Sequence, residues 1–88
     1  MPFSLLIGPK AEKFIEKSER VLSARLLSKI EALSANPFPS DVKRVEHKEF
    51  EGEIVFRVRV GDYRVLYTVN FSTSRVLVFR IDRRERVY

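Results

Sequence analysis

The sequence predicts one α+β domain, in which an N-terminal strand and a two-helix hairpin pack on a twisted antiparallel sheet in the order β-α-α-β-β-β. Two periodicities indicate this class: apolar residues recur every three or four positions between residues 10 and 35, and at every second position after residue 53. The length of 88 residues provides one hydrophobic core and no second domain. We therefore expect residues 1–88 to form a single domain.

The first residues predict a short strand that turns into a helix. The apolar run Phe3–Ile7 ends at Gly8 and Pro9, and proline is tolerated in the first turn of a helix because its missing N–H has no partner there. Residues 10 to about 18 then form a first helix, with a narrow apolar stripe between lysine and glutamate side chains.

A second and stronger helix is expected from about Glu19 to Ala35. Its apolar side chains recur at spacings of three and four and form one buried face: Leu22, Leu26, Leu27, Ile30 and Leu33. Asn36 and Pro37 end it, because proline disfavours the helical conformation in the residue before it. Ser18 and Ser23 are the candidate caps at the break between the two helices.

Residues 40–53 carry charges of alternating sign, and we interpret them as a solvated loop or a weak strand. His47 is the one histidine of the chain, and a side chain that titrates near neutrality is a candidate acid or base. Glu51 and Glu53 are candidate carboxylate bases, because they immediately precede a strongly patterned strand. All three residues equally suit a solvated loop, and no spacing singles one out.

Two strands joined by a tight turn are the strongest local signal. Residues 54–60 and 63–69 both alternate between apolar and other side chains, and Gly61-Asp62 separates them. A two-residue turn of this kind needs positive φ, which glycine accepts, and it fixes the pairing of the strands. One face then carries only apolar and aromatic residues, which we expect to pack beneath the helices: Ile54, Phe56, Val58, Val60, Tyr63, Val65, Tyr67 and Val69.

The other face of this hairpin places like charges side by side. Arg59 lies across from Arg64 in the expected register, and opposed like charges destabilise a sheet by roughly a few tenths of a kcal/mol. Arg57 lies across from Leu66, one step along the same face. Folding does not require such a pair of arginines. We expect an anion beside them, either a bound phosphate or a carboxylate from residues 46–53.

A third β-patterned run, Arg75–Ile81, follows a polar turn of residues 72–74 and completes a meander. Which of its sides joins the core stays open, because a change of one residue in the turn inverts the alternation. The two alternatives are Val76 with Val78, and Leu77 with Phe79 and Ile81. The remaining residues, 82–88, can fold back beside the arginines.

The net positive charge of the chain lies in its C-terminal part. Residues 57–88 contain eight arginines against three acidic residues, an excess of +5, whereas the nine basic and nine acidic residues of 1–56 cancel. Arginine grips phosphate oxygens with two donors at once and stacks on bases. This distribution favours a nucleic-acid partner on an otherwise neutral scaffold.

Other classes of protein are not supported by the composition. With no cysteine and one histidine, neither disulfides nor a zinc site is expected, and we expect no cofactor. The N-terminus lacks a signal-peptide pattern, and no apolar run is long enough to span a membrane. A cytoplasmic location is the resulting expectation.

Two strings in the sequence resemble a known family. Phe56–Tyr67, which reads FRVRVGDYRVLY, and Asp82–Tyr88, which reads DRRERVY, resemble the RelE/ParE superfamily of toxins from toxin–antitoxin pairs. The resemblance spans nearly the whole chain, and the order of the expected elements agrees with it. It implies a single RelE-like toxin domain that acts as a ribosome-dependent, metal-independent mRNA endonuclease, cleaves the codon in the A site and so inhibits translation.

The resemblance also implies site residues and partners. Its active-site positions fall on one set of residues: Arg57, Arg59, Arg64, Arg84 and Tyr88. In the best-known RelE pattern the first two are lysines, so the charge is kept here while the possible chemistry changes. The neighbouring Arg80, Arg83 and Arg86 are expected to bind RNA, or to be ordinary solvated charge. The implied antitoxin is RelB-like, acidic and partly disordered; it covers the basic face and forms a hetero-oligomer with the toxin.

Arginine supplies charge to such a site but no base. RNA cleavage by 2′-OH attack needs in-line geometry, stabilisation of phosphoryl charge and proton transfer. Because arginine keeps its proton, Tyr88 is the candidate for proton transfer, and surrounding cations favour its ionised form. Pure positioning of the mRNA within the ribosome is the alternative.

Two other functions stay open. A ParE-like toxin shares the fold, inhibits DNA gyrase and needs no convergence of the five active-site positions. The presence of arginine or tyrosine at each of these positions argues against it. A catalytically silent module that binds RNA or the antitoxin is the other alternative, which the exchange of lysine for arginine keeps open.

Overall fold

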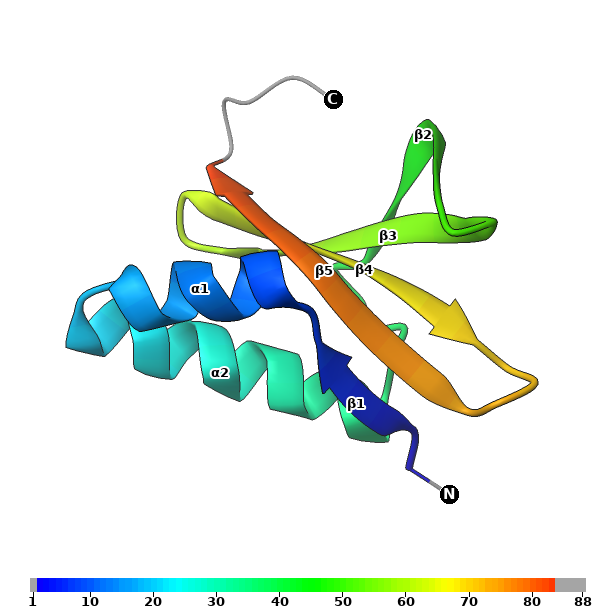
Figure 1. Ribbon diagram of the computed structural model, residues 1–88, viewed down its shortest axis with the longest axis horizontal. Coiled ribbons are helices and arrows are strands. Elements are labelled where there is room, and N and C mark those ends of the chain that lie inside the picture. Colours follow the sequence, from blue (N-terminus) through cyan, green and yellow to red (C-terminus); the bar gives the residue numbers. More distant parts are fainter. Residues whose placement is uncertain (1, 84–88) are drawn as a thin grey trace.

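The computed structural model describes residues 2–83 of the 88-residue chain. Its elements are β1 (Ser4–Ile7), α1 (Pro9–Lys17), α2 (Arg20–Ala35), β2 (Lys43–Phe50), β3 (Glu53–Val60), β4 (Tyr63–Asn70) and β5 (Arg75–Arg83). The strands form one sheet in the order β1-β5-β4-β3-β2, with β1 parallel to β5 and the other neighbours antiparallel. The two helices lie side by side on one face of this sheet (Figure 1). The predicted α+β class is confirmed.

Strand β2 extends the predicted order by one strand. It forms where the sequence suggested a loop or a weak strand, and it joins β3 through the two-residue turn Glu51-Gly52, in which φ is 52° and 80°. Its pairing with β3 is interrupted between Arg44 and Glu49, and His47 within this interval has φ 59°. An irregular strand does not alternate strictly, which is why its sequence carries no clear period of two.

A proline marks the start of α1, and a capping carboxylate marks the start of α2. Pro9 occupies the first turn of α1, as predicted. At the break between the helices, the carboxylate of Glu19 accepts a hydrogen bond of 2.6 Å from the N–H of Leu22 and caps α2. Neither Ser18 nor Ser23, the two candidates at the break, is the N-cap of α2, whereas Ser18 is the C-cap residue of α1. Ser18 instead donates its hydroxyl to the carbonyl oxygen of Phe14 at 2.7 Å.

The β3–β4 hairpin has the register that the sequence predicts. All six pairs from Val55–Thr68 to Val60–Tyr63 agree with it, and Gly61 in the turn has φ 57°. Ile54 is the exception on its apolar face, since it is 40% exposed. The face packs under the helices in a core of buried residues: Ala11, Ile15, Leu26, Ile30, Leu33, Val58, Val60, Val65, Tyr67, Val69, Val76, Val78 and Ile81.

A smaller apolar cluster lies on the opposite face of the sheet. Its buried members are Val45, Val55, Leu66 and Phe79, with Phe50 and Leu77 packed against them. The rings of Phe50 and Phe79 stack at a centroid distance of 4.0 Å. This contact anchors the end of β2 over the sheet, so that part of this face is covered.

Strand β5 contains a bulge, which decides the face on which Ile81 and the residues beside it lie. Leu66 of β4 faces Arg80, whereas the next residue, Tyr67, faces Val78, which leaves Phe79 as the extra residue. Both faces receive apolar residues of β5: Val76, Val78 and Ile81 on the helix side, Leu77 and Phe79 on the other. The sequence offered two strict alternations, and neither describes this strand.

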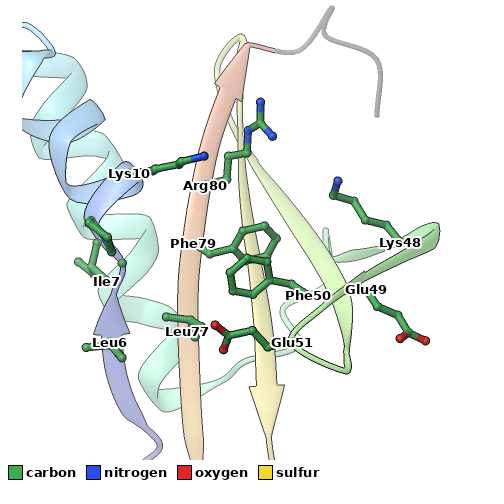
Figure 2. A pocket seen from close by; sticks show the side chains of 12 residues that line it. Leu6, Ile7, Lys10, Lys48, Glu49, Phe50, Glu51, Leu77, Phe79 and Arg80 are labelled. Atoms are coloured by element: carbon green, nitrogen blue, oxygen red, sulfur yellow. The ribbon is translucent and has the colours of Figure 1, made fainter.

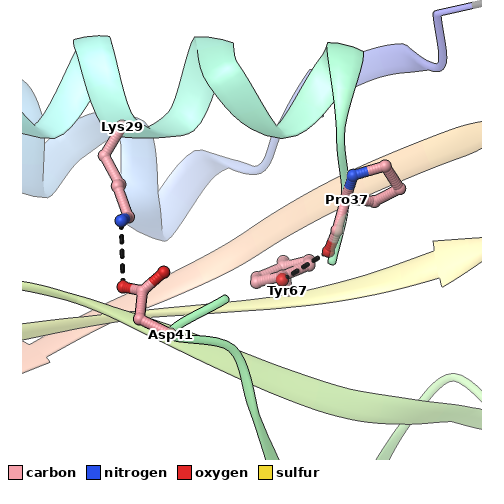
Figure 3. Close-up of polar contacts among 4 residues, drawn as sticks. All are labelled: Lys29, Pro37, Asp41 and Tyr67. Atoms are coloured by element: carbon pink, nitrogen blue, oxygen red, sulfur yellow. Dashed lines mark hydrogen bonds and ion pairs between the residues drawn. The ribbon is translucent and has the colours of Figure 1, made fainter. Parts of the chain in front are cut away.

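Two polar contacts tie the region after α2 to its surroundings (Figure 3). The buried hydroxyl of Tyr67 donates a hydrogen bond of 2.7 Å to the carbonyl oxygen of Pro37, and burial raises the pKa of this tyrosine. Nζ of Lys29 lies 2.9 Å from Oδ2 of Asp41, and this hydrogen bond lowers the pKa of the carboxyl group. Tyr67 is thus a packing residue, as predicted.

Candidate nucleic-acid interface

Four arginines lie close together on the face of the sheet that points away from the helices, and we call them the arginine face: Arg57, Arg59, Arg64 and Arg80. Arg75 lies on the same side of the sheet but at the other end of β5. Directly opposed residues of neighbouring strands carry their side chains on the same side of a sheet. Arg59 is the partner of Arg64, and Leu66 has Arg57 on one side and Arg80 on the other. The structure therefore brings together three predicted catalytic residues and one predicted RNA-binding residue.

These four side chains differ in exposure. Arg59 and Arg80 are exposed, whereas Arg57 and Arg64 are half-buried, and the Nε atom of Arg64 is fully buried. A half-buried guanidinium group has fewer orientations to lose when it binds a phosphate. The pair Arg59 and Arg64 thus combines one mobile and one restrained cation at directly opposed positions.

Lys43 at the start of β2 adds a fifth cation to this row. It is exposed and is the direct cross-strand partner of Arg57. Sequence analysis missed it, because residues 40–53 did not show the alternation that would have placed Lys43 in a strand. The only available signal was the position of Glu51-Gly52, a turn that brings the preceding residues back along β3.

An acidic residue also belongs to this row. Asp82 of β5 is the direct partner of Arg64, and its side chain is 14% exposed. Its Oδ2 atom lies 2.8 Å from Nε of Arg80. The five cations and this carboxylate give this row of six residues a formal charge of five minus one, or +4. The sequence predicted an anion beside the arginines but did not indicate Asp82.

Arg83 lies apart from the arginine face. It is the partner of Tyr63 on the helix side of the sheet, and its guanidinium carbon lies 5.6 Å from the centre of that ring. Arg83 therefore lies on the other face of the sheet from Arg80, and RNA binding by Arg83 stays a prediction. Three further predicted site residues fall outside the described residues: Arg84, Arg86 and Tyr88.

The three candidate bases, His47, Glu51 and Glu53, lie at separate positions along the β2–β3 hairpin. His47 is exposed at the irregular part of β2, and Glu51 is exposed in the turn. Glu53 accepts a hydrogen bond of 3.2 Å from the side-chain amide of Asn70. It lies four residues before Arg57 along β3, or about 13 Å at the rise of an extended strand. The side chain of Glu53 thus links β3 to β4 and does not lie beside the row of arginines.

An apolar groove borders the arginine face. It has a volume of about 520 Å³ and lies between β1 with the start of α1 on one side and the end of β2 on the other. Leu6, Leu77 and the stacked Phe50 and Phe79 form much of its surface, as Figure 2 shows. The head groups of three cations lie around its upper end: Lys10, Lys48 and Arg80. Arg80 therefore belongs to both the groove and the arginine face.

Within residues 2–83, no three His, Cys, Asp or Glu side chains gather as metal ligands would. No helix of this part of the chain is long and apolar enough to cross a membrane.

Comparisons of sequence and of fold both find similarity to toxins of toxin–antitoxin systems. A family described as "ParE toxin of type II toxin-antitoxin system, parDE" matches residues 5–88. The RelE1 protein of Methanocaldococcus jannaschii is 37% identical over 62 residues, which cover 67% of this chain and 64% of that protein. The match thus spans less than two thirds of that relative.

Solved structures with the same fold come from toxin–antitoxin complexes. The archaeal RelE–RelB complex from Pyrococcus horikoshii contains a chain that superposes with a TM-score of 0.82 at 24% identity, over 99% of this chain and 100% of that one. A chain of the RelBE2 complex from Mycobacterium tuberculosis superposes with a TM-score of 0.76 at 24% identity, over 96% and 100%. At these identities the likeness concerns the fold.

Proposed function

This chain belongs to the ParE toxin family of type II toxin–antitoxin systems, and we propose that it is a toxin that cleaves mRNA in the ribosomal A site and so inhibits translation. The resemblance to the RelE/ParE superfamily stated from the sequence is confirmed by this match, and the RelE1 relative agrees with it. Cleavage, dependence on the ribosome and independence of metal ions are parts of the proposal.

The observation that carries the proposal is the convergence of arginines on one face of the sheet. Arg59 and Arg64 are directly opposed, and Arg57 and Arg80 flank them one step along. Two guanidinium groups at this spacing are suited to bind the non-bridging oxygens of one phosphate, each through two N–H donors. The same groups stabilise the extra negative charge that develops on the phosphorus during attack by the 2′-OH.

Proton transfer is assigned to residues beyond the arginine face. Arginine remains protonated at neutral pH and cannot accept the proton of the 2′-OH. We propose Tyr88 for this role and Arg84 as a further cation of the active site. Both follow from the resemblance, and both lie outside the described residues.

An acidic antitoxin is the proposed protein partner. The solved complexes of the same fold pair RelE with RelB. In this chain the apolar groove offers a surface for apolar side chains, and the cations at its upper end suit acidic ones. An antitoxin bound there reaches Arg80 and so extends to the arginine face.

A gyrase-inhibiting toxin is the second candidate, favoured by the description of the matched family as ParE. Inhibition of gyrase requires a binding surface but no transition-state stabilisation. The two candidates therefore differ in whether the opposed arginines are needed for cleavage of RNA, which a single assay decides.

The deciding experiment maps cuts by primer extension on an mRNA carried by translating ribosomes. Wild-type protein, Arg64→Ala and the same mRNA without ribosomes are compared, with Arg75→Ala as a matched control at the far end of β5. We expect cuts within A-site codons for the wild type and for Arg75→Ala alone. A folded wild-type protein that leaves the mRNA intact, yet blocks supercoiling by gyrase, would establish the second candidate.

A further inference from the structure

The bulge in β5 determines which side chains meet the arginine row. With Phe79 as the extra residue, Arg80 faces Leu66 and Asp82 faces Arg64. Without this extra residue the alternation would shift by one, so that Arg80 and Asp82 would point toward the helices and Ile81 away from them. Bulges are used in sheets to re-aim side chains in this way. Here the bulge delivers a cation and a carboxylate together.

The carboxylate of Asp82 forms an ion pair with Arg80 and lies directly across from Arg64 in the strand register. Its Oδ2 atom is buried and lies 2.8 Å from Nε of Arg80, and its cross-strand neighbour Arg64 also has a buried Nε. The side chain of Asp82 is 14% exposed, against 49% for Arg80. A charge withdrawn from water to this degree is stable only where opposite charges compensate it. The ion pair with Arg80 therefore compensates the charge of Asp82, and it restricts the side chain of Arg80 in turn.

We propose that Asp82 is a positioning residue of the arginine face, which holds Arg64 and Arg80 in the orientation used for phosphate and lowers RNA affinity in doing so. This inference rests on the proposed function, because the orientation matters for cleavage. Long arginine side chains lose rotamer freedom when they bind, and a carboxylate that fixes them beforehand removes part of that loss from the transition state. The same carboxylate repels the phosphate, so it weakens ground-state binding.

Opposite effects on binding and cleavage are the signature of this role. In Asp82→Asn the side chain keeps its size and loses its charge. We expect it to bind a 2′-O-methyl RNA, which cannot be cleaved, roughly two- to fivefold more tightly at 0.15 M salt. We expect its maximal rate of cleavage on translating ribosomes to fall on the order of tenfold. Asp82→Glu restores part of the rate, because it returns the charge near the same place.

A matched control separates charge from position. Asp62→Asn makes the same charge change in the exposed β3–β4 turn, and its cleavage rate should equal that of the wild type. An unchanged rate in Asp82→Asn would overturn the proposal. Equal losses of binding and cleavage, together with a lower melting temperature, would also overturn it, since they indicate an ion pair that serves stability alone.

A measurement that needs no catalysis tests the positioning role of Asp82 independently of the proposed nuclease activity. Heteronuclear NMR of the Nε–Hε groups reports how restrained each arginine is on the picosecond to nanosecond timescale. In the wild type, Arg64 and Arg80 should be more restrained than the exposed Arg75, and in Asp82→Asn they should approach it. Unchanged order would refute the positioning role. Absence of wild-type cleavage, with this loss of order present, would refute only the nuclease.

Discussion

The hydroxyl of Tyr67 donates a hydrogen bond of 2.7 Å to the carbonyl oxygen of Pro37, and so joins the middle of β4 to the segment that follows α2. The tyrosine is fully buried and the proline is buried as well. A buried carbonyl that loses its donor keeps the cost of desolvation without compensation. This hydrogen bond therefore helps to fix the position of the segment between α2 and β2 relative to the sheet.

Tyr67→Phe tests this contact. We expect the free energy of unfolding to fall by about 1–3 kcal/mol, because the carbonyl of Pro37 becomes unsatisfied while the ring still packs. Urea denaturation followed by circular dichroism measures the change. Tyr63→Phe is the matched control, since its half-buried ring packs on Phe14 at 5.6 Å and lies beneath Arg83. An equal loss in both variants would contradict the role of the hydrogen bond.

The contact between Asp41 and Lys29 predicts that the stability of the fold depends slightly on pH in the acidic range. The hydrogen bond from Lys29 lowers the pKa of Asp41 below the usual value of an aspartate. A carboxyl group with a depressed folded pKa contributes stability above its unfolded pKa, and this contribution is lost as the pH falls through the folded pKa. We therefore expect the loss below about pH 4. Because its side chain is 43% exposed, the contribution is roughly a few tenths of a kcal/mol.

Urea denaturation at pH 7 and at pH 3 measures this contribution. The difference in stability between the two pH values should be smaller in Asp41→Asn than in the wild type. Glu31→Gln, an exposed carboxylate of α2, is the control and should leave the difference unchanged. An identical acid response in Asp41→Asn would mean that the contact with Lys29 adds nothing to stability.

The sequence predicted those parts of the fold in which one local signal dominates. Gly61-Asp62 fixes the β3–β4 register, and with it the opposition of Arg59 and Arg64. No turn residue in the sequence marks the bulge at Phe79, whose ring stacks on Phe50 of β2, a strand distant in the sequence. The positions of Arg80, Asp82 and the other β5 side chains were therefore beyond prediction.

Strand β2 shows a second limit. Its alternating charges conceal a strand that buries only Val45 fully and half-buries Phe50, since the rest faces solvent or lies in the irregular interval. Lys43 was missed for this reason, although Glu51-Gly52 is a typical hairpin turn. A tertiary contact, the stack of Phe50 on Phe79, decides the conformation here.

The two faces of β5 predict that neighbouring arginines differ in their roles. Arg80 lies on the arginine face, whereas Arg83 packs over Tyr63 on the helix side. Arg80→Ala should therefore lower the rate of A-site cleavage by about tenfold, and Arg83→Ala should change it by less than about twofold. Kinetics on programmed ribosomes measure both. Equal losses would place the RNA across the edge of the sheet, in contact with both faces.

The apolar groove predicts a variant that separates cleavage from inhibition by the antitoxin. Leu6 lines the groove on β1 and is 48% exposed, so Leu6→Glu places a charge there with little cost to the core. We expect its affinity for the acidic antitoxin to fall by at least about tenfold, because the charge is desolvated on binding and repels acidic side chains. Cleavage should be unchanged, since Leu6 lies outside the arginine face.

Val21→Glu provides the matched control for this prediction. Val21 is a 62% exposed apolar residue of α2 that does not line the groove, so the same charge there should leave antitoxin affinity unchanged. Titration calorimetry with the cognate antitoxin gives the affinities, and growth after induction of each variant with the antitoxin gives the physiological readout. Leu6→Glu should remain toxic when the antitoxin is present, whereas Val21→Glu should be neutralised. Full neutralisation of both would place the antitoxin elsewhere on the toxin.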